Sequence, residues 1–216
     1  MGSGPCVTVG ENGRLGPMEW ATAGRPLPGE QASGDQPITV GIDADSALFG
    51  VIDGLGHGPA AAAAAMRAVE ALQRNPGERV EVLVQLCHRV LAGTRGAAMT
   101  LARVDFASRT LTWTGVGNVT ANLVAKDATG VHIRSSARLA AGIAGYRIPE
   151  IRPAQVVSLR AGDLIVIATD GIDEDHLYSI DFANPATAIA EVMLAKHAKE
   201  SDDAMVLAAR HRGASK

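Results

Sequence analysis

The chain has 216 residues and a mass of 22.3 kDa, with 47% hydrophobic residues, 20% charged residues and a formal net charge of −3. These values fit one globular domain with a sizeable core and exclude an intrinsically disordered or collagen-like chain. Aromatic residues make up only 3% of the chain, so it cannot build a stacking platform for single-stranded nucleic acid. The slightly negative charge also argues against binding to a phosphate backbone.

The sequence predicts a soluble, cytoplasmic protein. Its longest apolar stretches are far shorter than the roughly 20 residues that a membrane helix needs. The first 17 residues are rich in glycine and lack the basic flank and apolar centre of a signal peptide. We expect residues 1–17 to be a flexible tail and residues 18–212 to form one domain. The two cysteines, Cys6 and Cys87, have no disulfide-framework or zinc spacing, and Cys87 is expected to be a buried thiol.

Apolar periodicity predicts a hairpin followed by two helices. Two apolar runs at 36–43 and 47–53 are separated by three turn residues, which is typical of a β-hairpin. A helix is predicted to open at Pro59, with Met66, Val69 and Leu72 on its inward face. The next helix is predicted over 80–91, where apolar residues recur with helical spacing.

The rest of the chain favours strands, with one more helix near the end. That helix is capped by Asn184 and Pro185, with Ile189, Val192 and Met193 facing inward. The expected strands lie at 98–102, 111–114, 120–124, 131–134, 155–159, 163–168 and 204–209. Because helices and strands come in groups and do not alternate, the pattern predicts an α+β fold: two antiparallel sheets packed face to face, with helices outside.

Several aspartates come directly after apolar strands or stand beside glycine. They lie in four segments: Ser-Gly-Asp at 33–35, Asp-Gly-Leu-Gly-His-Gly at 53–58, Thr-Asp-Gly-Ile at 169–172 and Ser-Asp-Asp-Ala at 201–204. Carboxylates at strand ends converge readily, and glycines let backbone carbonyls approach an ion. Such hard oxygen donors suit magnesium or manganese better than zinc. A single Asp-Gly pair is an ordinary turn, but four such sites in one small domain favour a metal centre.

The order of these segments resembles the metal-dependent protein phosphatases of type 2C, most closely the SpoIIE branch and its short RsbX type. Further matching motifs are Gly-Glu at 29–30, Thr-Arg-Gly-Ala at 94–97, Gly-Val-Gly-Asn at 115–118 and Gly-Asp at 162–163. The resemblance covers roughly residues 18–210. It implies a sandwich of two antiparallel sheets flanked by helix pairs, in agreement with the fold class predicted above.

By position, the resemblance implies ligands for two Mn²⁺ or Mg²⁺ ions. Asp53 would bridge both ions, and the carbonyl of Gly54 would bind the first ion together with Asp35. Asp170 and Asp202 would hold the second ion. The resemblance therefore gives Asp53, Asp170 and Asp202 as the catalytic carboxylates. It gives Asp203 as a supporting contact.

Such a centre implies hydrolysis of phosphoserine or phosphothreonine. The ester carries about two negative charges, so attack needs charge neutralisation and a hydroxide near neutral pH. Water shared by two divalent ions loses its proton far more easily than bulk water and could attack phosphorus directly. The chain has no nucleophile elbow and no cysteine phosphatase loop, which favours a reaction without a phosphoenzyme. The RsbX-type resemblance implies phosphorylated STAS-domain proteins of stress signalling as substrates.

For three other residues, the sequence leaves two possible roles open. His57 could protonate the leaving oxygen, or its ring could bond the loop backbone. The wider type 2C family carries its histidine directly after the Asp-Gly pair, where this chain has Leu55. Arg25 and Arg95 could grip the phosphate or lie solvated at the surface, and for Arg95, at a helix-to-strand junction, a structural use is favoured.

The segment 138–149 is expected to border the active site. It has no clear periodicity. In the family that the chain resembles, the corresponding stretch lies near the switch region of regulated members, so the resemblance implies that Tyr146 and Arg147 contact a protein substrate but not a small ester.

Two other functions remain open from the sequence. The chain could be a catalytically weak or inactive phosphatase-fold module that binds phosphoproteins, since Met205 stands where many relatives carry threonine. Clustered carboxylates argue against this, because they repel one another without a metal. The chain could also hydrolyse small phosphate esters with the same two metals.

Overall fold

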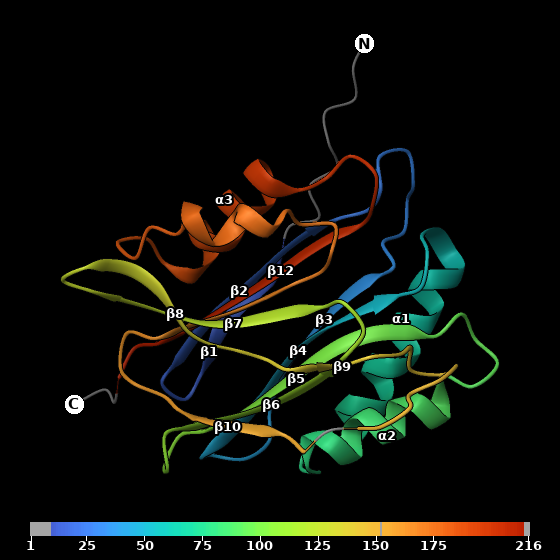
Figure 1. Ribbon diagram of the computed structural model, residues 1–216, viewed down its shortest axis with the longest axis horizontal. Helices are drawn as coiled ribbons and strands as arrows, with labels where there is room; N and C mark the ends of the chain where they lie inside the picture. Colours follow the sequence, from blue (N-terminus) through green and yellow to red (C-terminus); the bar gives the residue numbers. More distant parts are fainter. Residues whose placement is uncertain (1–9, 152, 214–216) are drawn as a thin grey trace.

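Two β-sheets are stacked between two layers of helix in the computed structural model, which describes residues 10–151 and 153–213 (Figure 1). This arrangement confirms the predicted α+β sandwich. All strand pairs are antiparallel except one short parallel pair, between β6 and β9. No helix in the described part of the chain is long and apolar enough to cross a membrane.

The first sheet, called sheet A here, has the order β1-β2-β12-β11-β7-β8. Its strands are β1 (Asn12–Leu15), β2 (Met18–Arg25), β12 (Ala204–His211), β11 (Leu164–Ala168), β7 (Thr120–Asp127) and β8 (Gly130–Ser136). Sheet B has the order β10-β6-β5-β4-β3, and β9 pairs with β6. Its strands are β10 (Gln155–Ser158), β6 (Thr110–Val116), β5 (Ala97–Asp105), β4 (Ser46–Gly54), β3 (Asp35–Gly41) and β9 (Leu139–Ala140).

The helices cover the outer face of each sheet. On sheet B lie α1 (Gly58–Arg74) and α2 (Val80–Val90), the pair that the periodicity predicted. On sheet A, α3 (Ala186–His197) packs against β2 and β12 and is accompanied by the short 3-10 helix η1 (Glu174–Ser179). The second helix pair is therefore one α-helix and one 3-10 helix.

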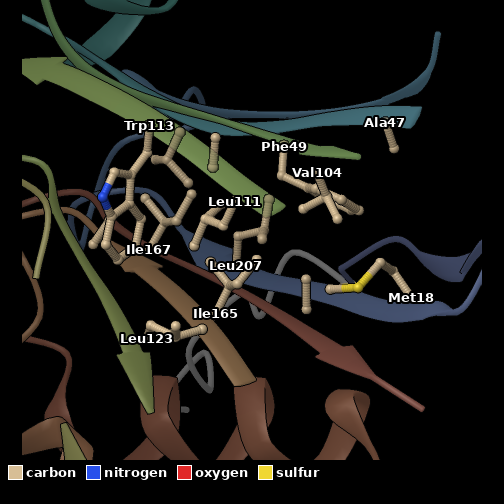
Figure 2. Close-up of a cluster of buried hydrophobic side chains, with 14 of the residues drawn as sticks. Met18, Ala47, Phe49, Val104, Leu111, Trp113, Leu123, Ile165, Ile167 and Leu207 are labelled. Carbon is tan, nitrogen blue, oxygen red and sulfur yellow. The ribbon is translucent and has the colours of Figure 1, made fainter. Parts of the chain in front are cut away.

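Apolar side chains fill three layers, one between the sheets and one beneath each helix layer. The central layer contains Trp113 and Phe49 among aliphatic residues of both sheets (Figure 2). On the inner face of α2, Cys87 is fully buried and free, as predicted. Burial raises the pKa of this thiol to about 12, so it is an inert part of the core.

The inward face of α1 differs from the prediction. Leu72 is buried as expected, but Val69 is only half-buried and Met66 is 54% exposed. Alanines of α1 form the buried face instead: Ala61, Ala62, Ala64, Ala65, Ala68 and Ala71. Small side chains let the helix lie close to sheet B, and in a run of six alanines the apolar periodicity cannot say which of them face inward.

The N-terminal segment also differs from the prediction. A flexible tail was expected up to residue 17, but Asn12–Leu15 form β1, which pairs with β2 in an antiparallel hairpin. Neither strand has a clear alternation of apolar and polar residues, so the sequence pattern missed both. Cys6 and the rest of residues 1–9 lie outside the described residues.

Candidate metal centre

Strand register brings the four acidic segments to one end of the sandwich. Asp35 is the first residue of β3 and pairs directly opposite Asp53, near the end of β4. Asp170 follows the end of β11, and Asp202 comes just before the start of the neighbouring strand, β12. Sheet B therefore supplies two of these carboxylates, and sheet A supplies the other two.

The carboxylates lie close enough to raise one another's pKa. Burial and the nearby charges of Asp170, Asp202 and Asp203 raise the pKa of Asp53 from 3.8 to about 7. Burial, followed by the charge of Asp53, raises the pKa of Asp35 well above its usual range. Burial and the charge of Asp202 also raise the pKa of Asp170. Cations at this place would relieve the repulsion.

The donor set has the chemistry of a magnesium or manganese site. The ligand positions implied by the resemblance offer only hard oxygens, which these ions prefer. Within the described residues, no three His, Cys, Asp or Glu side chains yet stand in a metal-holding arrangement. Two of the carboxylates also accept protein hydrogen bonds: Asp35 Oδ2 from the Thr169 hydroxyl at 2.7 Å and Asp202 Oδ1 from a backbone N–H at 2.9 Å. Each carboxylate keeps lone pairs that could bind an ion, so the residues fit the ions chemically.

Gly54 is required by the packing of α1. A Cβ at this position would lie only 2.2 Å from the carbonyl oxygen of Ala61, so only glycine lets the helix approach the end of β4. The Gly54 N–H donates to the carbonyl of Gly34 at 3.0 Å, which joins the end of β4 to the residue before β3.

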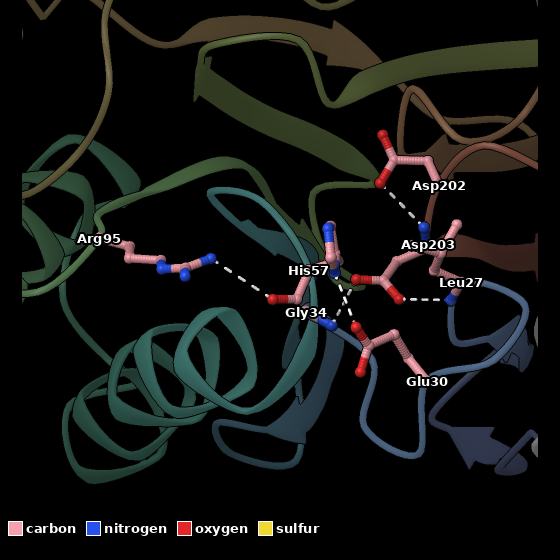
Figure 3. A network of polar contacts seen from close by, with 7 residues as sticks. All are labelled: Leu27, Glu30, Gly34, His57, Arg95, Asp202 and Asp203. Atoms are coloured by element: carbon pink, nitrogen blue, oxygen red, sulfur yellow. Dashed lines mark hydrogen bonds and ion pairs between the residues drawn. The ribbon is translucent and has the colours of Figure 1, made fainter.

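Asp203 connects the two sheets beside the carboxylates. It is buried, and its carboxylate accepts the N–H of Leu27 at 2.7 Å and the N–H of Gly34 at 2.8 Å (Figure 3). These bonds tie the start of β12, in sheet A, to the loop that leads into β3, in sheet B. Asp203 thereby fixes the distance between the two halves of the centre.

Two residues around Asp170 were given no role by the sequence analysis. Asn118 donates its side-chain N–H to Asp170 Oδ2 at 2.6 Å, and Lys199 Nζ donates to the Asp170 backbone carbonyl at 2.6 Å. Asn118 belongs to the Gly-Val-Gly-Asn motif that carried the resemblance, so the motif was the available signal. Lys199 is brought here by the end of α3, which the sequence pattern could not predict.

Arg25 has neither of its predicted roles. It is 7% exposed, so it is neither solvated nor free to grip a phosphate. Its guanidinium donates to the backbone carbonyls of Pro26 at 3.0 Å, Asp202 at 3.4 Å and Lys199. Arg25 therefore holds the turn that presents Asp202.

His57 and Arg95 lie together beside the carboxylates (Figure 3). The ring of His57 is about half exposed, and its Nδ1 lies 2.9 Å from Glu30 Oε1, so a carboxylate and not the loop backbone holds it. Arg95 is exposed and donates to the His57 carbonyl at 3.4 Å. This contact is a structural use of Arg95, at the junction of α2 and β5 as predicted.

Comparison with known proteins identifies the family. Residues 43–212 match the family model described as Stage II sporulation protein E (SpoIIE). A search of curated protein sequences gives no significant match.

Solved structures match over most of the chain. One, described as the bacterial stressosome, a modular system adapted to control secondary messenger signalling, has 31% identity and a TM-score of 0.79 over 89% of this chain and 99% of its own. RsbX in complex with magnesium has 19% identity and a TM-score of 0.74 over 96% of this chain and 99% of its own. The phosphatase domain of SpoIIE from Bacillus subtilis, with a fragment of its regulatory domain, has 18% identity and a TM-score of 0.72 over 93% of this chain and 64% of its own.

The fold and the carboxylate centre define the class of metal-dependent protein serine/threonine phosphatases of type 2C. Within that class, the chain belongs to the SpoIIE family.

Proposed function

We propose that this protein hydrolyses phosphoserine or phosphothreonine on bacterial signalling proteins. The observation that carries the proposal is the convergence of Asp35, Asp53, Asp170 and Asp202 from both sheets at one end of the sandwich, with raised pKa values for the first three. Closely spaced, mutually repelling carboxylates, of which Asp35 is fully buried, cost stability unless they bind cations, so a cluster of this kind indicates a metal-dependent function.

The proposed ligands are those that the motifs implied. Asp35, Asp53 and the Gly54 carbonyl would hold one divalent ion, and Asp53, Asp170 and Asp202 would hold a second. When bound, Mn²⁺ or Mg²⁺ would neutralise the phosphate ester and make a coordinated water acidic enough to act as the nucleophile near neutral pH. No side-chain nucleophile is required in this proposal.

The remaining residues of the centre orient these ligands. Asn118 and Lys199 fix the carboxylate and the backbone of Asp170, while Arg25 fixes the turn of Asp202. Hydrogen-bond partners of metal ligands commonly change metal affinity by about 10- to 100-fold when they are removed.

His57 is the proposed proton donor for the leaving serine oxygen. The carboxylate of Glu30 faces Nδ1 and accepts its proton in a hydrogen bond. A ring protonated at both nitrogens would then give its Nε2 proton to the leaving oxygen and keep the Nδ1 proton toward Glu30. We expect His57→Gln to slow a poor leaving group, such as a serine alkoxide, more than a good one, such as nitrophenolate. Equal slowing of both would assign His57 a structural role.

Phosphorylated STAS-domain proteins of a cytoplasmic stress-signalling complex are the proposed substrates. The support is the structural likeness to a protein described as the bacterial stressosome, at 31% identity.

The test is hydrolysis of a generic aryl phosphate by the purified chain with manganese, with EDTA, and by Asp53→Asn in manganese. Activity that is lost in the second and third conditions supports the two-metal hydrolase. A phosphorylated STAS protein, compared with free phosphometabolites, then tests the substrate class. A folded chain that binds a phosphorylated STAS protein but hydrolyses neither substrate would establish the phosphoprotein-binding module instead.

A further inference from the structure

An exposed loop beside the carboxylate centre is held in place by unusually close packing. In the segment 142–147, the backbones of Ile143 and Arg147 exchange hydrogen bonds of 2.8 and 3.0 Å and close a tight loop. Gly142 has a φ of +129°, and a Cβ there would lie 2.3 Å from the Arg147 carbonyl oxygen. Gly145 has a φ of +92° and donates its N–H to His88 of α2 at 3.0 Å. The loop is therefore anchored in a single conformation.

The anchored loop presents two side chains to solvent. Tyr146 is 83% exposed, and Arg147 is also exposed. The ring of Tyr146 is therefore accessible to a partner molecule. Arg147 forms no salt bridge with any residue that the structure describes.

The loop is connected to the metal centre through the first residue of β5. Ala144 and Ala97 exchange hydrogen bonds of 2.9 Å in both directions, and Ala97 pairs with Gly54 at the end of β4. The N–H of Leu55 donates to the carbonyl of Gly96 at 3.0 Å. These hydrogen bonds connect the residues that follow Asp53 to the exposed segment 142–147.

Two residues between the loop and the centre extend the same surface. Leu55 is 47% exposed, and Arg95 is exposed, with its guanidinium against Gly56 and the His57 carbonyl and without a salt bridge to the described residues. We call Leu55, Arg95, Tyr146 and Arg147 the rim. It combines two apolar side chains with two cations that have no carboxylate partner within the described chain.

We propose that the rim docks an acidic segment next to the phosphorylated serine of the substrate protein, with an apolar side chain against Tyr146. The inference rests on the proposed phosphatase function and adds a substrate preference to it. The choice of an acidic segment follows from charge complementarity: the rim cations lie beside the centre that takes the phosphate, so they meet the residues that flank it. A phosphopeptide with basic flanks would be repelled.

The experiment compares two phosphoserine peptides that differ only in four flanking aspartates replaced by asparagines. We expect the wild type in manganese to show a kcat/KM about three- to five-fold higher for the acidic peptide than for the asparagine peptide. For each enzyme variant, kcat/KM is divided by that variant's rate with an aryl phosphate, which corrects for basal activity. Arg147→Ala and Arg95→Ala should each reduce this ratio towards one, and added salt should do the same. Arg14→Ala is the matched control, because Arg14 is exposed in β1 at the opposite end of sheet A.

A binding measurement separates this proposal from the proposed function. Fluorescence anisotropy of the two labelled peptides with Asp53→Asn in manganese reports the flank preference without turnover. Tyr146→Ala should weaken binding of both peptides, whereas Tyr178→Ala, which removes a similarly exposed tyrosine from η1, should not. Equal binding of the two peptides, or the same loss in Arg14→Ala, would overturn the docking surface. Absence of hydrolysis of both the aryl phosphate and a phosphorylated STAS protein would instead overturn the phosphatase function.

Discussion

Burial and the charges of three neighbouring carboxylates together raise the pKa of Asp53. The motifs located Asp53 and its three proposed partner aspartates correctly at one end of the fold, because each motif ties an acid to a strand end or a glycine turn. Arg25 and Lys199 could not be assigned from the sequence, because their roles depend on contacts between segments more than 25 residues apart. The sequence therefore predicts the acids of the centre better than the residues that hold them.

Replacing Asp53 should affect stability and metal binding in opposite directions. In EDTA near pH 8, Asp53→Asn removes one of several repelling charges and should raise the free energy of unfolding by up to about 4 kcal/mol, since the pKa shift from 3.8 to about 7 spans about three units and each unit is worth about 1.4 kcal/mol. The same variant should lose the rise in Tm that manganese gives the wild type. Asp45→Asn, in the exposed turn before β4, serves as the control in thermal unfolding. A destabilised Asp53→Asn in EDTA would contradict the repulsion argument.

Asn118 should act as a positioning residue for Asp170. Asn118→Ala removes the 2.6 Å hydrogen bond and should weaken manganese binding about 10-fold, which calorimetry or the metal dependence of Tm can measure. Unfolding in EDTA should change little, because Asp170 is exposed. Unchanged metal affinity would show that Asn118 has no part in the centre.

Among the elements, helices and strands were predicted well where the periodicity was strong. The hairpin of β3 and β4, the helix α2 and the buried strand β11 all appear where apolar spacing placed them. The strands β1 and β2 and the inward face of α1 were missed, because alanine, glycine and threonine give little contrast between buried and exposed positions. The segment 138–149 was predicted as a border of the site, with Tyr146 and Arg147 contacting a protein substrate. The tight loop at 142–147 was not predicted, since its shape depends on glycines packed against distant backbone.

Gly145 tests how firmly this loop is anchored. Gly145→Ala should be unfavourable for two reasons. The residue has a positive φ, and the added Cβ would lie 2.7 Å from the Leu91 carbonyl oxygen. Gly93 also has a positive φ, of +80°, but its Cβ would meet nothing within 4 Å. We expect Gly93→Ala to cost about 1 kcal/mol of stability and Gly145→Ala about 2–3 kcal/mol in urea unfolding. An equal loss of stability in the two variants would show that the loop can shift to accommodate the added methyl group.

At the scale of the whole molecule, the carboxylates link folding to pH. Because folding raises the pKa of Asp53 from 3.8 to about 7, the folded chain binds a proton more tightly than the unfolded chain. The resulting stabilisation is fully present below about pH 4 and is lost as the pH rises through about 7. Asp35 and Asp170 shift in the same direction.

In EDTA, the free energy of unfolding should therefore fall between about pH 5 and pH 8 in urea titrations. Magnesium or manganese should remove most of this fall, because the ions replace the protons as partners of the carboxylates. Asp53→Asn in EDTA should show a smaller fall than the wild type. Stability that rises over this range in EDTA would contradict the raised pKa values.

The position of the centre at the junction of the two sheets has a consequence for how assembly of the molecule can be followed. A partly ordered state could keep every strand pair within each sheet and yet leave the sheets unregistered against each other. Such a state would hold at most half of the ligands, so it would bind cations only weakly. Cation affinity followed during refolding would therefore report the moment when the two sheets lock together, separately from the formation of either sheet.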